Sequence, residues 1–260
     1  FRSSHERCPL RCEFGEMPSL LRGAVQVCGG AAIQSRCHMD GLTFWFIGAL
    51  AAFFVGLGKG GVPVITAMAV PMMSLVMSPV LAAGLLLPVY IVADMFGLYN
   101  YRRNFNPRVL KIMMAAMPIG VFIGWATSSQ VPESAVTMII GLIGASFALT
   151  MILRKPIEAT PKEAKVGPGL FWGTITGFTS FVSHSGATPY QVYTLPLGMD
   201  KITFAGTVTV AFAYINIVKL IPYYLLDQLS VTNLRTTLVL FIPAVIGVFA
   251  GVRLVRVMPE

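Results

Sequence analysis

Long continuous apolar runs constrain the fold of this chain more than any other feature of its sequence. A helix that crosses the hydrocarbon core of a bilayer needs about 20 such residues, and five runs reach or approach that length: 80–99, 109–127, 135–153, 202–224 and 234–255. None of them alternates with a period of two, so they predict helices and not the strands of a membrane barrel. We therefore predict an all-α, polytopic membrane protein.

The charge of the chain supports this class. Only 12% of its residues are charged, about half the share in soluble domains, which disfavours a soluble enzyme, a nucleic-acid-binding module and a disordered scaffold. The net charge of +8 comes mostly from short loops between apolar runs, as is typical of cytoplasmic loops. We predict no nucleic-acid partner and a multi-pass protein of the cell inner membrane, with two cytoplasmic loops that carry Arg102, Arg103, Arg108 and Lys111, and Arg154, Lys155, Lys162 and Lys165.

Residues 1–38 differ from the remainder of the chain. They are polar and Arg-rich, and they lack both a spanning run and the apolar region of a signal peptide. We expect translation to begin at Met39, with 1–38 as a non-native or disordered leader. A metal site is the alternative, because all four cysteines and His38 lie in this leader. Their spacing has no C-x-x-C pair, so we predict no metal and no cofactor; the four are Cys8, Cys12, Cys28 and Cys37.

The rest of the chain contains an internal repeat. Residues 39–153 form the first half, 154–168 a cytoplasmic linker and 169–260 the second half. Matching positions keep their order at an almost constant offset: Phe44-Trp45 with Phe171-Trp172, Pro63 with Pro189, and Ala83-Gly84 with Ala205-Gly206.

Each half opens with a pair of short apolar segments, 42–57 with 62–77 and 170–182 with 190–197. We interpret each pair as a broken helical hairpin followed by three transmembrane helices. The distribution of basic loops then requires the two halves to have inverted topologies. Only two long runs follow the second hairpin, so we expect the last helix to be missing through truncation at the C-terminus.

Inverted repeats with broken helices are typical of secondary transporters, whose anion sites lie near the bilayer midplane at half-helix N-termini. The two breaks therefore supply the candidate substrate-binding residues: Gly58, Lys59, Gly60, Gly61, Ser183, His184, Ser185, Gly186, Thr188 and Gln191. Two of these side chains have a second interpretation. Lys59 could snorkel to the cytoplasmic surface, and His184 could bond a carbonyl instead of contacting the anion or coupling protons.

Three further polar residues fall inside predicted spans. Asp94 and Asn216 align across the repeat, and Lys219 follows Asn216 by one helical turn. Ionisable groups at such depth face a cavity or pair with one another. Asp94 could pair with Lys59 or with Lys219, and the residues could also make a structural contact between helices. We predict a role in coupling transport to a proton or sodium ion, or an intramembrane polar contact.

Several of these motifs resemble the TauE/SafE family of sulfite and organosulfur anion exporters. The resemblance covers 42–257 and rests on Gly56-Leu-Gly-Lys-Gly-Gly-Val-Pro63, Gly177-Phe-Thr-Ser180, Ser185-Gly-Ala-Thr-Pro189 and Ala205-Gly-Thr-Val208 with Asn216. It implies export of sulfite, a sulfonate or another organosulfur anion, coupled to an ion gradient. The partners would be this small anion and the lipid bilayer.

Three alternatives to that function stay open. Transport of small carboxylates is the nearest, because a helix N-terminus distinguishes carboxylate from sulfonate only weakly. An intramembrane hydrolase would use Ser183 or Ser185 with His184, although adjacent side chains rarely meet the geometry of a nucleophile and its base. An ion channel would need a selectivity filter, which no segment of the sequence resembles. We expect a transporter and no enzyme.

Overall fold

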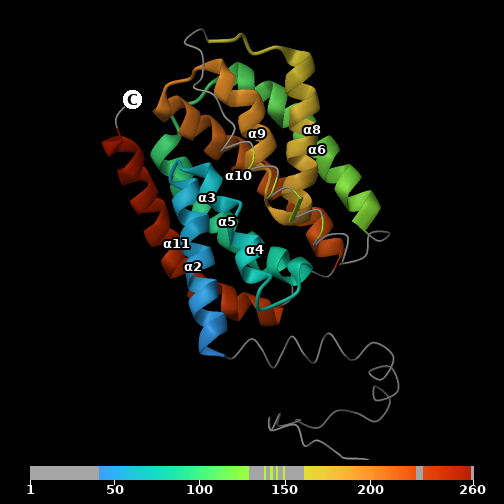
Figure 1. Cartoon of the computed structure of the whole chain (residues 1–260), viewed down its shortest axis with the longest axis vertical. Helices are drawn as coiled ribbons and strands as arrows, with labels where there is room; N and C mark the ends of the chain where they lie inside the picture. Colours follow the sequence, from blue (N-terminus) through green and yellow to red (C-terminus); the bar gives the residue numbers. More distant parts are fainter. Residues whose placement is uncertain are drawn as a thin grey trace, which may run out of the picture.

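The fold is entirely helical in the part of the chain that the structure, a computed structural model, describes: residues 41–128, 161–226 and 231–258, with the single positions 138, 141, 142, 145 and 149 (Figure 1). In chain order the helices are α2 (Leu42–Lys59), α3 (Pro63–Thr66), α4 (Ala69–Met73), α5 (Pro79–Tyr101), α6 (Pro107–Ser128), α8 (Val166–Ser183), α9 (Ala187–Thr194), the 3₁₀ helix η2 (Leu195–Leu197), α10 (Lys201–Leu225) and α11 (Val231–Val257).

Within the described residues, five helices are long and apolar enough to cross a membrane: Leu42–Lys59, Pro79–Tyr101, Pro107–Ser128, Lys201–Leu225 and Thr236–Val257. The predicted all-α membrane class is thus confirmed. The predicted runs 80–99, 109–127, 202–224 and 234–255 correspond to α5, α6, α10 and α11. The leader 1–38, most of the run 135–153 and the first part of the linker 154–168 lie outside the described residues.

The first broken pair differs from its prediction in length. The segment 42–57 was expected to be a short arm, but α2 continues to Lys59, and its 18 residues qualify it as a span. The extension is favourable because the backbone N–H of Gly60 still bonds the carbonyl of Gly56, which closes the last turn. The segment 62–77 instead divides into the short helices α3 and α4.

Local sequence explains where several helices begin. Pro63 and Pro79 stand in the first turn of α3 and α5, where a missing N–H costs nothing. Asp200 caps α10, since one of its carboxylate oxygens accepts from the backbone N–H groups of Ile202 and Thr203 at 3.1 and 3.0 Å.

The long helices pack in two parallel pairs on opposite sides of a central antiparallel pair (Figure 1). In the first parallel pair α2 contacts α11, and in the second α6 contacts α8. Glycines allow the close approach: Gly251 of α11 touches the carbonyl of Leu57, and Gly177 of α8 touches that of Met117. α5 and α10 form the antiparallel pair between them.

Four hydrogen bonds connect loops and helix ends at one end of the molecule. They join the loop before α6 to α10, α6 to the segment before α8, that segment to η2, and the start of α10 to the residue after α11. The bonds are Asn106 N to Thr207 Oγ1, Arg108 Nε to Ala164 O, Lys162 N to Pro196 O and Lys201 Nζ to Met258 O.

Candidate functional site

The first break lies between the end of α2 and the start of α3, where the chain turns inside the molecule. Gly61 has φ +120°, a conformation that side chains rarely tolerate. Gly58 touches the side chain of Thr66 so closely that a Cβ would have no room. The phenol of Tyr101 donates to the carbonyl of Gly60 at 2.7 Å, so α5 satisfies this buried carbonyl at the end of α2.

The second break turns at His184, directly after α8. His184 has φ +54°, which makes it the one residue other than glycine with a positive φ in the described parts of the chain. A left-handed backbone costs a non-glycine residue about 1–2 kcal/mol. Two contacts hold the side chain in place: its ring stacks on Tyr90 with centroids 4.5 Å apart, and its Nε2 lies 3.0 Å from the carbonyl of Ala83.

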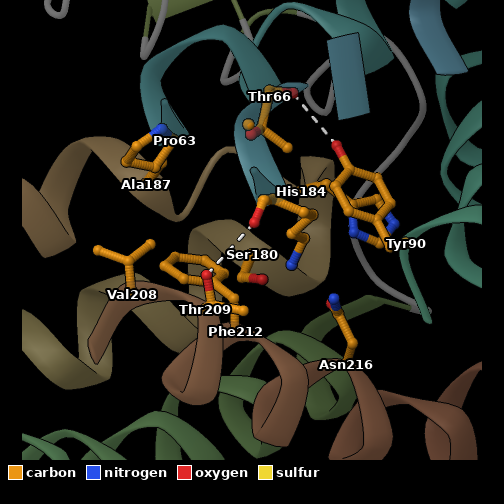
Figure 2. Close-up of a pocket in the computed structure, with 12 residues that line it drawn as sticks. Pro63, Thr66, Tyr90, Ser180, His184, Ala187, Val208, Thr209, Phe212 and Asn216 are labelled. Carbon is orange, nitrogen blue, oxygen red and sulfur yellow. Dashed lines mark hydrogen bonds between the residues drawn. The ribbon is translucent and has the colours of Figure 1, made fainter. Parts of the chain in front are cut away.

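A small cavity lies where the two breaks meet α5 and α10. The space open to the centre of a water molecule is only about 20 Å³, enough for roughly one water. Figure 2 shows the lining side chains converging from these elements. They are Gly58, Lys59, Pro63, Thr66, Tyr90, Ser180, His184, Ala187, Val208, Thr209, Phe212 and Asn216.

An ion pair and an amide stand at one side of this cavity. Lys59 Nζ lies 2.6 Å from Asp94 Oδ1, and the Asn216 amide donates to Asp94 Oδ2 at 2.6 Å. The open choice of partner for Asp94 is therefore resolved in favour of Lys59. Lys59 is 4% exposed, so the alternative in which it snorkels to the surface is wrong for this conformation.

Lys219 occupies a separate position behind the cavity. Its Nζ lies 3.1 Å from both the carbonyl and the hydroxyl of Ser180 and 2.8 Å from Nδ1 of His184. Lys219 is completely buried. It follows Asn216 on α10 by one turn, so the two residues project from the same face of that helix.

These contacts determine the tautomer of His184. The carbonyl of Ala83 can only accept, so Nε2 of His184 carries the proton and donates to it. Nδ1 is then the acceptor for Lys219. A proton on both ring nitrogens would direct an N–H at the Lys219 amine, so the geometry favours a neutral imidazole. Both interpretations offered for His184 remain compatible with this position: it bonds a carbonyl, and it also lines the cavity.

Two aromatic rings flank the amine of Lys59. Its Nζ lies 5.4 Å from the ring centre of Tyr90 and 5.3 Å from that of Phe212, within the range of cation–π attraction. The phenol of Tyr90 is fixed by donating to the carbonyl of Thr66 at 3.2 Å, as the dashed line in Figure 2 marks. Apart from Asp94, Lys59 Nζ has no polar partner among the described residues. It therefore retains N–H groups that a ligand could use.

The remaining candidate residues of the second break do not line the cavity. Ser183 and Ser185 direct their hydroxyls to the carbonyls of Thr179 and Ser183, each at 3.3 Å. Gly186 packs near the Phe212 ring, Thr188 is half-buried, and Gln191 is buried with its amide nitrogen unpartnered among the described residues. Neither serine hydroxyl bonds the His184 ring, whose partners are Ala83 and Lys219.

The sequence prediction missed several side chains of the cavity. Tyr90 and Phe212 were absent from it, although they are separated by the same 122 residues as Asp94 and Asn216. Extending the repeat alignment along α5 and α10 would have found both. Ser180, Thr66 and Thr209 carried no such signal, because isolated hydroxyls in a helical run most often bond the preceding turn.

The comparisons with known proteins agree with this architecture. A multi-spanning helical protein with two broken helices around buried charges belongs to the class of membrane transporters. The sequence profile described as "Sulfite exporter TauE/SafE" matches residues 39–260. The chain therefore belongs to the TauE/SafE family, as its motifs suggested. No curated protein and no solved structure matches it.

Proposed function

We propose that this protein is a secondary transporter that exports a small sulfur oxyanion, sulfite or a sulfonate, across the cell inner membrane. Family membership supports transport of an anion of this kind. The cavity between the two breaks is the proposed binding site, with Lys59 and Asn216 as the polar groups nearest the ligand and Ser180 beside them.

The observation that carries the proposal is an imbalance of buried charge. Lys59 and Lys219 are cationic residues with exposed fractions of 4% and 0%, whereas Asp94 is the one acidic side chain among the buried described residues. Isolated charge in a low-dielectric interior is costly unless something compensates it. A bound anion would supply that compensation beside Lys59.

Alternating access of two inverted repeats is the proposed mechanism. The order of helices recurs: a broken pair precedes two long helices in each half. α2 runs parallel to α11, and α11 ends beside Lys201, so α2 also runs toward that end of the molecule. α8 starts at the same end, where Arg108 contacts the carbonyl of Ala164 just before it. These contacts favour opposite directions for α2 and α8, as inverted topology requires. Rocking one half against the other would open the cavity to alternate sides.

A small carboxylate is the second candidate substrate. Lys59 offers N–H donors and a point charge, and such a group binds carboxylate and sulfonate alike. The proposed coupling ion is a proton or sodium. The small volume of the cavity favours substrates of few atoms in either case, since the site must enlarge around whatever it binds.

The test is a flux measurement on the protein reconstituted in liposomes. Uptake of sulfite, methanesulfonate and acetate would be followed with and without a proton or sodium gradient. The double variant Lys59→Met/Asp94→Asn removes the ligand-facing amine without leaving the carboxylate of Asp94 unpaired. We expect gradient-driven uptake of the sulfur anions in the wild type and loss of it in the double variant.

Lys111→Met is the matched control, since Lys111 is an exposed lysine of α6 outside the cavity. Its flux should equal that of the wild type. Faster uptake of acetate than of sulfite would favour the carboxylate candidate. Absence of flux for all three anions in the wild type would contradict the proposed function.

A further inference from the structure

We propose that the cavity selects anions by valence and carries only singly charged ones, so that sulfite is transported as hydrogen sulfite. This inference rests on the proposed function and narrows its substrate. It follows from the sum of the charges buried around the cavity, argued group by group.

Lys219 contributes one positive charge. Its nitrogen has three neighbours within hydrogen-bond distance, the carbonyl and hydroxyl of Ser180 and Nδ1 of His184. An ammonium can donate to all three at once, whereas a neutral amine has two N–H donors and would accept from the Ser180 hydroxyl through its lone pair. We take Lys219 as charged, and the Lys219→Met variant below tests that assignment. Because every donor is occupied, Lys219 would act on a ligand through its field and not by direct contact.

Lys59 and Asp94 cancel one another. They are in contact at 2.6 Å, and Asp94 also accepts from Asn216, as an ionised carboxylate does. His184 is neutral by the tautomer argument above. The other titratable groups around the site are the phenols of Tyr90, Tyr190 and Tyr223, which carry no charge. Tyr90 and Tyr223 donate to carbonyls. The described interior around the cavity thus has a net charge of one positive unit.

Valence selection follows from that sum. A monoanion brings the interior to neutrality, whereas a dianion would leave one uncompensated negative charge in a small buried space. Val208 and the ring of Phe212 line that space together with Tyr90, and it has room for only about one water. The excess charge of a dianion would therefore be poorly solvated.

The consequence for sulfite is chemical. Near neutral pH sulfite is a mixture of the monoanion and the dianion, and raising the pH converts the former into the latter. The transported fraction should follow the monoanion. Methanesulfonate keeps a single negative charge over the same pH range, and sulfate keeps two, so these anions of similar shape isolate valence from size.

The first experiment compares the three anions in liposomes containing the wild-type protein, at about pH 6 and about pH 8. We expect methanesulfonate flux to exceed sulfate flux by roughly tenfold or more, because an unpaired buried charge is strongly disfavoured. Sulfite flux should fall as the pH rises, while methanesulfonate flux stays constant. The constant methanesulfonate flux excludes titration of the protein as the cause.

The second experiment changes the charge of the site. Lys219→Met brings the sum to zero, and we expect methanesulfonate flux to fall by roughly tenfold or more. Asp94→Asn raises the sum to two positive units and should increase sulfate flux relative to methanesulfonate. Lys111→Met should leave the ratio unchanged. Size-exclusion profiles in detergent would show whether each variant is folded.

Either of two results would overturn the valence inference while the proposed function stands: sulfate carried as fast as methanesulfonate, or sulfite flux that rises with pH. A folded Lys219→Met variant with wild-type fluxes would equally contradict it, because Lys219 would then carry no charge in the transporting protein. Absence of flux for every anion would instead contradict the proposed function.

Discussion

Asn216 donates a 2.6 Å hydrogen bond to Asp94, and the two residues are 122 positions apart in the sequence. Phe212 follows Tyr90 by the same spacing, and these two rings flank the amine of Lys59. Positions that the predicted repeat aligns therefore meet in space, where α5 and α10 pack against one another. Any movement between the two halves of the chain must alter the contacts at this point.

The ion pair between Lys59 and Asp94 should be strongly coupled. Lys59→Met leaves Asp94 as a buried carboxylate without a cation, and we expect it to lower the free energy of unfolding by about 3–5 kcal/mol. Thermal and denaturant unfolding in detergent would measure this loss.

A double-mutant cycle provides the control for that loss. Asp94→Asn in the Lys59→Met background removes the unpaired charge, so the double variant should be more stable than Lys59→Met alone. Equal stability of the two would show that the cost comes from lost packing and not from the unpaired carboxylate.

Close glycine contacts should determine the stability of the two parallel helix pairs. Gly56 touches the carbonyl of Ala244 in α11, and Gly177 touches that of Met117 in α6. Gly56→Ala and Gly177→Ala should each lower the free energy of unfolding by about 1–3 kcal/mol through overpacking. Thermal unfolding would measure it.

Gly167→Ala is the matched control in α8, because a Cβ at Gly167 meets nothing within 4 Å. It should leave stability unchanged or raise it by up to about 1 kcal/mol, since alanine restricts the unfolded chain. Destabilisation by Gly167→Ala of the same size as by Gly177→Ala would count against helix contact as the cause.

The cap that Asp200 places on α10 should make the stability of the protein depend on pH. The hydrogen bonds from Thr203 hold the pKa of Asp200 below its ordinary value. Its stabilisation is therefore complete above the pKa of the unfolded chain and is lost as the pH falls through the lower folded value. Asp200→Ala should cost about 1 kcal/mol at neutral pH.

Asp200→Asn distinguishes the capping hydrogen bonds of Asp200 from the effect of its negative charge. Asparagine can still accept from the backbone, so this variant should retain most of the neutral-pH stability and show less dependence on acid. Unfolding midpoints between neutral and acidic pH would compare the three proteins. An identical acid dependence in the wild type and Asp200→Asn would exclude Asp200 as the titrating group.

The proposed topology predicts opposite accessibility at the two ends of the molecule. Residues 39–260 contain no cysteine, so single cysteines in a chain that starts at Met39 report position without background. Arg103→Cys and Glu163→Cys lie in the two predicted cytoplasmic loops. They should react with an impermeant maleimide only after the cytoplasmic side is exposed. Gly41→Cys should react from the opposite side in intact cells. Labelling of all three from one side would contradict the orientation.

The sequence was sufficient for the class and for α5, α6, α10 and α11, because hydropathy over about 20 residues depends little on tertiary context. It was less accurate at the breaks. α2 continued through Gly58 to Lys59, although glycine lowers helix propensity. The packing of Gly56 against α11 outweighs that local preference.

The partners inside the site depended on distances that spacing cannot supply. The sequence placed Asp94 within reach of either lysine, and only the packing of α5 against both α2 and α10 decides between them. The three-way coordination of Lys219 by Ser180 and His184 also follows from the left-handed turn at His184. No sequence pattern predicts that positive φ at His184, because residues other than glycine rarely adopt it.

The cavity at the centre of this protein has room for about one water molecule. A file of hydrogen-bonded waters cannot form through so small a space, and protons move quickly through membranes along such files. We therefore expect this conformation to conduct few protons across the bilayer. A cell could therefore keep many copies of it in an energised membrane without dissipating its proton gradient while no substrate is present.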